Sequence, residues 1–237
     1  MHRADTFPFT FTSPSGVMRV ILLAATMWVL ALKATPAQPQ EWSQYLAFED
    51  FFSAGFPGEP TIRETTYTTE FGHTLPARVY NAEDDFGTYS VTAVDWREAP
   101  QLHEASYEAC KASVGDLRGG DNPAVCGNQT NGEIRGATLH AAIGFLRRES
   151  ELTHFGLTAA EGVEGTHIQL INEDGSQTHV AIYWHEYRLY IMEGTAPRGM
   201  PPPVAFSTSM GFIDVEGRRI RYSGRYTPLF PVPSRGR

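Results

Sequence analysis

The strongest constraint on the fold is an Asp-Gly pair, Asp174-Gly175, between two stretches rich in strand-forming residues, HIQLI and THVAIYW. Asp-Gly is favoured in the tight turns that join antiparallel strands, because these turns need positive φ angles. A further strand is predicted over 187–193. Upstream, Tyr89, Val91 and Ala93 alternate with polar residues in a predicted strand over 88–95, after strands over 61–70 and 77–81. The sequence therefore predicts an antiparallel meander.

The stretch FFSAGFPGEP, residues 51–60, could be a ligand-holding glycine loop or a strand that runs into a turn. A phosphate-binding loop needs glycines at defined offsets, with Lys and Ser or Thr, and a following helix. None of these features is present. Apolar residues alternate with small ones up to Pro57-Gly58, which favours a strand and its exit turn.

Two amphipathic helices are predicted, over 102–114 and 138–148, and a short third helix over 204–210. A last hairpin or strand is expected around 218–222. The predicted fold class is α+β, with an antiparallel β-sheet of about six to seven strands covered by two or three helices. The predicted domains are residues 1–37, an extension with a signal peptide, and residues 38–237, one globular domain whose C-terminal tail is loose. The apolar stripes expected to face the sheet are Leu102, Ala105, Ala109 and Ala112 in the first helix, and Leu139, Ala142, Ile143 and Leu146 in the second.

The N-terminal segment has the pattern of an export signal. Thirteen uncharged residues, 20–32, follow Met18-Arg19 and end at a small-residue site, which is too short for the roughly 20 residues of a membrane-spanning helix. Cleavage is expected between Ala37 and Gln38, and the mature chain is expected to have no stable membrane span. Because the signal is complete from Met18, residues 1–16 are interpreted as an upstream extension. The alternatives are a signal with a long N-terminal region and a retained, uncleaved anchor.

Charge excludes one class of partner. The chain has 19 Lys and Arg against 27 Asp and Glu; residues 1–37 hold three of the former and one of the latter, which leaves 16 and 26 and a formal charge of about −10 for the mature chain. Nucleic-acid binding depends on clustered Lys and Arg, and the sequence has no such cluster. Nucleic acid is therefore not an expected partner.

The two cysteines, Cys110 and Cys126, are expected to form a disulfide, because exported proteins reach an oxidising compartment. In the chain-entropy model a loop of this length adds about 3 kcal/mol. The alternative is a nucleophilic thiol, but no matched His motif accompanies either cysteine.

Four segments resemble exported bacterial proteins of unknown function: FFSAGFPGEP, LPARVY with YSVTAVDW, RLYIMEGTAPRGMPPP and SMGFIDVEGRRIRY. The resemblance spans residues 42–222. In strand order those proteins look similar to the PsbP-like fold, an antiparallel sheet covered by helices, which occurs in lipoproteins, assembly factors and photosystem subunits. The resemblance implies a fold and brings no catalytic residues, since fold does not determine function.

Two half-motifs of zinc proteases occur, His103-Glu104 and His185-Glu186. The second histidine of such a motif would stand at Tyr107 or Leu189, so neither is complete. No serine-nucleophile or dinucleotide motif is present. No metal and no cofactor is therefore expected.

One set of polar residues is a candidate recognition face. In a strand over 178–184, alternate residues share one face, and His179 and His185 would be about 20 Å apart, too far to bind one metal. Two interpretations stay open: the face is an outward sheet surface without function, or it is a recognition surface. The candidate face is His179, Tyr183, His185, Arg188 and Tyr190.

The leading functional hypothesis is an exported, periplasmic or secreted, non-enzymatic binding or accessory module for an envelope protein or a small ligand. The rival is a small-molecule enzyme, hydrolase-like, whose histidines and carboxylates converge only in three dimensions. A purely structural envelope component is a third reading.

Overall fold

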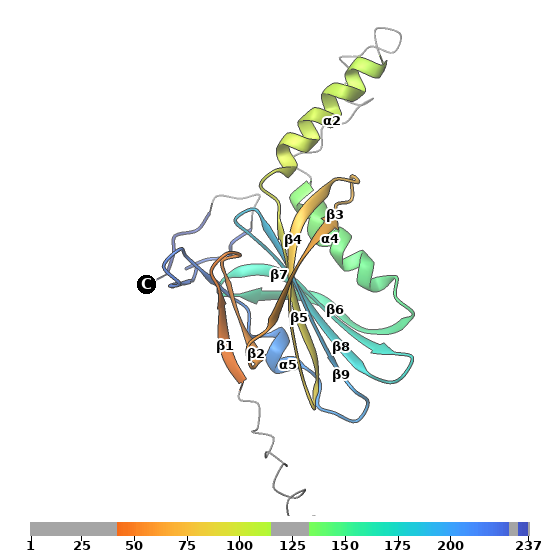
Figure 1. Ribbon diagram of the computed structural model, residues 1–237, viewed down its shortest axis with the longest axis vertical. Coiled ribbons are helices and arrows are strands. Elements are labelled where there is room, and N and C mark those ends of the chain that lie inside the picture. Colours follow the sequence, from red (N-terminus) through yellow and green to blue (C-terminus); the bar gives the residue numbers. More distant parts are fainter. Residues whose placement is uncertain (1–41, 115–132, 228–231, 237) are drawn as a thin grey trace, which may run out of the picture. The chain divides into compact units, whose positions relative to one another are not determined.

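The structure is a computed structural model that describes residues 42–114, 133–227 and 232–236 (Figure 1). The chain divides into two compact units, Met1–Pro39 and Gln40–Arg237, and the described residues all belong to the second. The predicted signal peptide, with Ala37 and Gln38, lies outside the described residues. No helix in the described part of the chain is long and apolar enough to cross a membrane.

A seven-stranded antiparallel sheet forms the body of the second unit, as the hairpin and alternation patterns predicted. The Asp174-Gly175 turn joins two of its strands, and Gly175 has φ +79°. In spatial order the strands are β3 (Thr61–Thr68), β4 (Thr74–Asp84), β5 (Gly87–Asp95), β9 (Arg188–Ala196), β8 (Gln177–His185), β7 (Val163–Asn172) and β6 (Ser150–Ala160).

A second, four-stranded antiparallel sheet was not predicted. The stretch FFSAGFPGEP contributes one of its strands and ends in a turn at Gly58, whose φ is +88°, so the strand-and-turn interpretation is confirmed. In spatial order the strands of this small sheet are β1 (Trp42–Ala47), β2 (Phe52–Pro57), β10 (Gly211–Ile213) and β11 (Arg219–Ile220).

The small sheet and a short helix, α5 (Val204–Ser207), pack on one face of the large sheet, called the inner face. Apolar residues that alternate along β5, β8 and β9 meet those of β2 and β10 there. This burial is the main stabilising contribution that such a two-layer arrangement offers. Among the residues of this core are Phe52, Phe56, Tyr80, Val91, Tyr183, Tyr190, Met192, Phe206 and Phe212.

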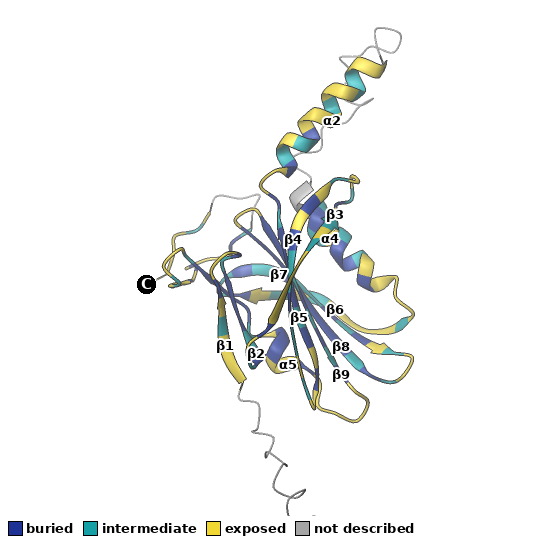
Figure 2. Cartoon of the chain, in the orientation of Figure 1, coloured by how far each residue is buried: buried dark blue, intermediate teal, exposed yellow. Residues whose placement is uncertain are grey.

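The other face of the large sheet, called the outer face, is covered by α4 (Glu133–Leu146) and by the first turn of α2 (Ala99–Val114) (Figures 1 and 2). The two long helices therefore cover the outer face, whereas the inner face is covered by the small sheet and α5, so the predicted helix-covered sheet is only partly matched. The outer core includes Leu75, Val94, Trp96, Ala137, Ala141, Phe145, Ile168, Ile182, Trp184 and Leu189.

The predicted apolar stripes of both helices were only partly right. In α4, Ala142 of the predicted stripe is buried, but Leu139 and Leu146 are 56% and 40% exposed, and Ala137, Ala141 and Phe145 are buried as well. The helix carries apolar residues on more than one side, so periodicity alone does not select the buried side. In α2, Leu102 contacts the outer core, but the three alanines of the predicted stripe, Ala105, Ala109 and Ala112, are exposed.

Cys110 lies in α2, and Cys126 lies outside the described residues, so their disulfide stays a prediction. In the tail that was predicted to be loose, the described residues 232–236 are held to the domain. Ser223 Oγ donates a hydrogen bond to the Ser234 carbonyl at 2.9 Å, and Arg235 forms an ion pair with Glu186 at 3.2 Å.

Candidate functional site

The five residues of the predicted recognition face share one side of the sheet, but that side is the inner face. His179, Tyr183, His185, Arg188 and Tyr190 are each at most 7% exposed. The prediction of an outward face was wrong because the small sheet, whose strands come from both ends of the domain, covers it. These residues therefore form no surface for a large partner.

Phe212 of the small sheet brings three of the five together. Its ring centroid lies 4.4 Å from that of His185, 5.6 Å from that of Tyr190 and 6.2 Å from that of Tyr183. His179 lies apart from them, with its ring 5.6 Å from that of His167. The Tyr190 hydroxyl donates a hydrogen bond to the Asp50 carbonyl at 2.7 Å, which ties β9 to the loop before β2.

Arg188, at the start of β9, is a buried cation without a carboxylate partner. It is 7% exposed, its Nε is buried with no hydrogen-bond partner, and no described carboxylate forms an ion pair with it. Its guanidinium carbon lies 4.6 Å from the centre of the Phe51 ring. A cation–π contact of this kind is worth about 0.5–2 kcal/mol, less than the several kcal/mol that burial of an unpaired charge costs.

The acids closest to Arg188 are engaged by other arginines. Asp50 accepts two hydrogen bonds from Arg78, at 2.8 and 2.9 Å, and a third from the Tyr80 hydroxyl at 2.7 Å. Asp95, which pairs with Arg188 across β5 and β9, is bound by Arg97. The hydrogen bond from Arg97 is the main cause that lowers the pKa of Asp95. Arg188 is therefore the arginine at this end of the sheet that forms no ion pair with a described carboxylate.

A pocket of about 330 Å³ opens beside Arg188, between the turn that joins β8 to β9 and the hairpin of β10 and β11. Asp214 stiffens that hairpin, because its Oδ1 accepts the backbone N–H groups of Glu216 and Arg218 at 3.0 and 2.9 Å. The lining residues are Phe51, Glu186, Arg188, Ile213, Asp214, Val215, Glu216, Arg218, Ile220 and Arg235.

The backbone is strained at Phe51, whose ring contacts Arg188, and in the turn that directly precedes Arg188. Phe51 has φ +55°, and the two central residues of the β8–β9 turn, Glu186 and Tyr187, have φ +45° and +59°. Turns with two positive φ angles favour Asn-Gly because a side chain is unfavourable there. Strain of this kind costs about 1–3 kcal/mol per residue and concentrates at functional sites.

His185 is a neutral, buried group beside the pocket. It is enclosed by the rings of Phe212, Tyr222 and Tyr226, and its Nε2 shares a hydrogen bond of 2.8 Å with the Tyr222 hydroxyl. Burial, and then the charges of Arg235 and Arg188, lower the pKa of His185 to about 3. The imidazole is therefore neutral at pH 7.

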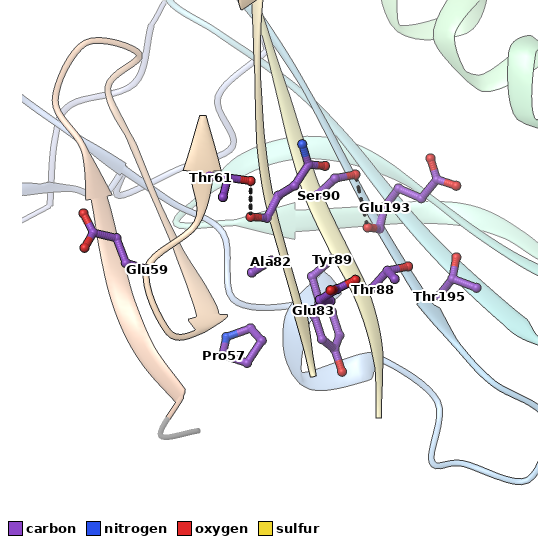
Figure 3. Close-up of a pocket in the computed structure, with 11 residues that line it drawn as sticks. Pro57, Glu59, Thr61, Ala82, Glu83, Thr88, Tyr89, Ser90, Glu193 and Thr195 are labelled. Atoms are coloured by element: carbon purple, nitrogen blue, oxygen red, sulfur yellow. Dashed lines mark hydrogen bonds between the residues drawn. The ribbon is translucent and has the colours of Figure 1, made fainter. Parts of the chain in front are cut away.

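A larger hollow of about 640 Å³ lies over β4, β5 and β9 (Figure 3). Its walls are polar and acidic, with Glu59, Glu83 and Glu193 among them and no Lys or Arg. Ser90 Oγ lies 3.5 Å from the Glu193 carbonyl, and the Glu193 carboxylate pairs with Arg148. No lining residue has a buried polar atom without a partner, so nothing in this hollow is held ready for a ligand.

The described residues bring together neither a metal site nor a histidine–carboxylate pair at the pocket. In residues 42–114, 133–227 and 232–236, no three His, Cys, Asp or Glu side chains are placed to hold a metal ion. Nε2 of His185 lies 4.0 Å from Oε1 of Glu186, beyond hydrogen-bond distance. His103, from the other half-motif, is buried against the rings of Phe71 and His73.

Comparisons with known proteins add a distant likeness. No protein-family model and no curated protein sequence matches the chain. Among solved structures, the chain is similar to the solution structure of cyanobacterial PsbP (CyanoP) from Synechocystis sp. PCC 6803, with 10% identity and a TM-score of 0.35 over 70% of this chain and 85% of that one. At this TM-score the likeness says nothing about activity.

Sequence reasoning identified Arg188 but missed the other residues of its pocket. Phe51 was placed in the strand-and-turn stretch 51–60, Arg218 in a last hairpin or strand around 218–222, and Asp214 and Val215 in no predicted element. The available signal was the segment GFIDVEGRRIRY, in which an acid–apolar–acid sequence is followed, after Gly217, by two arginines.

Proposed function

We propose that the mature chain is an exported, non-enzymatic binding or accessory module of the periplasm that holds a ligand in the Arg188 pocket. The observation that carries the proposal is a buried arginine, fixed on an aromatic ring, that faces a pocket and has no carboxylate partner. A charge kept in this state is destabilising for the free protein, whereas a bound ligand could satisfy its hydrogen bonds.

The pocket favours a small ligand or a single projecting group of an envelope protein. Its volume, about 330 Å³, is at the lower end of ligand pockets, and the five buried residues of the predicted face offer no wide surface. Binding rather than catalysis is supported by the surroundings of Arg188, which are rings, aliphatic walls and paired charges.

Export and binding need separate experiments. Fractionation of cells, followed by the intact mass of the exported chain, tests cleavage between Ala37 and Gln38; a chain that stays in the cytoplasm contradicts the location. Binding is tested by a thermal-shift screen of small molecules on the wild type and on two tryptophan variants.

The two variants differ only in position. Val215 is 71% exposed at the rim of the pocket, and Val204 is 49% exposed on α5, outside the lining. We expect Val215→Trp to obstruct the pocket and remove the shift given by any hit, while Val204→Trp leaves the shift unchanged. Hits that are insensitive to Val215→Trp bind elsewhere and contradict the proposal.

A further inference from the structure

The Arg188 pocket has a definite ligand chemistry, and this inference rests on the function proposed above. We propose that the pocket binds a monocarboxylate with an apolar body, with the carboxylate on the guanidinium of Arg188. Two kinds of molecule carry such a group: a free organic acid, and a peptide through its C-terminal carboxylate. Four features favour such a ligand: the pairing of the charges, the free donors of Arg188, the acids at the rim and the apolar walls.

The pairing of the charges, rather than their sum, favours an anion. The pocket is lined by three arginines and three acids, but the acids are engaged by two of the arginines. Arg235 pairs with Glu186 at 3.2 Å, and Arg218 pairs with Asp214 at 2.8 Å and with Glu216 at 2.9 Å. Arg188 forms no ion pair with a described carboxylate, although its charge is a minor cause that lowers the pKa of Asp95 on the neighbouring strand.

The donors of the guanidinium favour a planar anion. Its central carbon lies 4.6 Å from the centre of the Phe51 ring, and this cation–π contact leaves the N–H donors of the group to be satisfied elsewhere. Nε is buried without a hydrogen-bond partner among the described residues. A carboxylate accepts two parallel hydrogen bonds from a guanidinium and matches these donors in shape and charge.

The rim favours a single negative charge. Glu186, Asp214 and Glu216 surround the entrance, and Glu186 and Glu216 have side chains that are 50% and 58% exposed. Arg218 and Arg235 offset only two of these three negative charges, so a phosphate dianion would meet about twice the repulsion from the remaining charge that a monoanion meets. The site is in this respect unlike a phosphate site, which gathers unpaired arginines, lysines or backbone N–H groups.

The walls favour an apolar body behind the carboxylate. Ile213 and Ile220 are 1% and 4% exposed beneath the pocket, and Val215 at its rim is 71% exposed. Ile213 and Ile220 are already buried, so the apolar surface that a ligand could cover is mainly that of Val215. An aliphatic chain laid against Val215 would remove apolar area from water at about 25 cal/mol per Å², which a fully hydrophilic acid would not do.

The test is isothermal titration of the exported full chain, without a C-terminal tag because Arg235 lines the pocket. The probes are hexanoate, hexanamide, inorganic phosphate, and acetyl-Ala-Leu as its free acid and its amide. We expect hexanoate or the peptide acid to bind at least ten times more tightly than the matching amide, and phosphate not to compete. Binding by hexanoate identifies a free acid as the source, and binding by the peptide acid alone identifies a chain terminus.

Two substitutions of Arg188 test the role of its guanidinium, with Arg225→Met as the matched control. Arg225 is an exposed arginine outside the pocket that pairs with Glu164 at 3.1 Å. We expect Arg188→Met to abolish binding, Arg188→Lys to weaken it about tenfold because the two-pronged contact is lost, and Arg225→Met to have no effect. Circular dichroism and urea unfolding check that each variant is folded.

The outcomes separate this inference from the proposed function. If an acid and its amide bind equally tightly and Val215→Trp blocks both, the proposed preference for a carboxylate is wrong, but the pocket still binds a ligand. Tighter binding of phosphate than of hexanoate would also overturn it. Failure of every probe, together with a screen whose hits ignore Val215→Trp, would overturn both.

Discussion

Replacing Arg188 by methionine should stabilise the ligand-free protein. The substitution keeps an unbranched apolar side chain of similar reach and removes only the charged group. Because Arg188 is 7% exposed and has no ion pair, its charge is an unfavourable term in the free energy of folding. If Arg188 had a purely structural role, its replacement would instead lower the free energy of unfolding.

The magnitude follows from two opposing contributions. Burial of an unpaired ion costs several kcal/mol, and replacing buried charges by apolar residues is often neutral or stabilising by about 1–4 kcal/mol. The contact with the Phe51 ring, at 4.6 Å, offsets about 0.5–2 kcal/mol of that cost and is lost in the variant. The expected net gain is about 1–2 kcal/mol, or about 2–6 °C in Tm for a domain of this size.

The measurement is urea unfolding of the wild type and the variant without ligand, with Arg78→Met as a contrast. Arg78 is the arginine that holds Asp50, whose side chain is 5% exposed. Its removal leaves a buried carboxylate unpaired, which costs about 3–5 kcal/mol. The two substitutions remove the same group at the same end of the sheet and should move the midpoint in opposite directions. Loss of stability by more than about 1 kcal/mol in Arg188→Met would refute the reasoning, because the arginine would then be a structural support.

Three other predictions concern the surroundings of the pocket. Tyr187→Gly should be more stable than Tyr187→Ala by about 1 kcal/mol in urea unfolding, because only glycine relieves a φ of +59°; equal stabilities would argue against strain. The pKa of His185 is lowered to about 3 in the folded state, so its imidazole stays neutral there while the unfolded chain takes up a proton below about pH 6.5. Stability contributed by this difference is present above pH 6.5 and lost towards pH 3, so His185→Gln should lose about 2 kcal/mol less than the wild type between pH 7.5 and pH 5; parallel losses would contradict it. Peptide mapping of the exported chain without reductant should recover Cys110 linked to Cys126, and two free thiols would exclude the pair.

Six of the seven strands of the large sheet could be predicted because their information is local. Its hairpins join neighbouring segments, and the alternation along β5 and β8 is visible within nine residues. Strand β6 was not predicted, and the pairing of β5 with β9 joins segments about 100 residues apart, which no local pattern shows. The small sheet could not be predicted in the same way. Its central pairing joins Ser53 to Gly211, and its last strand has two residues, so neither length nor alternation marks it. The sequence thus shows which residues share a face but not what covers that face.

This gap explains the main error about the site. Histidine, tyrosine and arginine on one side of β8 and β9 were interpreted as an outward face, since charged residues are rarely buried. In the structure His185 is enclosed by rings, Tyr190 bonds the Asp50 carbonyl, and Arg188 lies on Phe51. Burial of Arg188 depends on residues about 25 and 140 positions away, which no local pattern brings together.

Three unfavourable features meet at Arg188, and their coincidence is the strongest argument for a ligand. A buried charge lacks a partner, Phe51 beneath it has φ +55°, and the turn before it has two side chains at positive φ. One substitution removes the charge or the strain at Phe51, and two remove the strain in the turn. A domain selected for stability alone would be expected to lose these features, since such changes are readily found. Unfavourable terms persist where binding compensates them, because the ligand satisfies the charge and the strained backbone fixes the guanidinium in position to receive it.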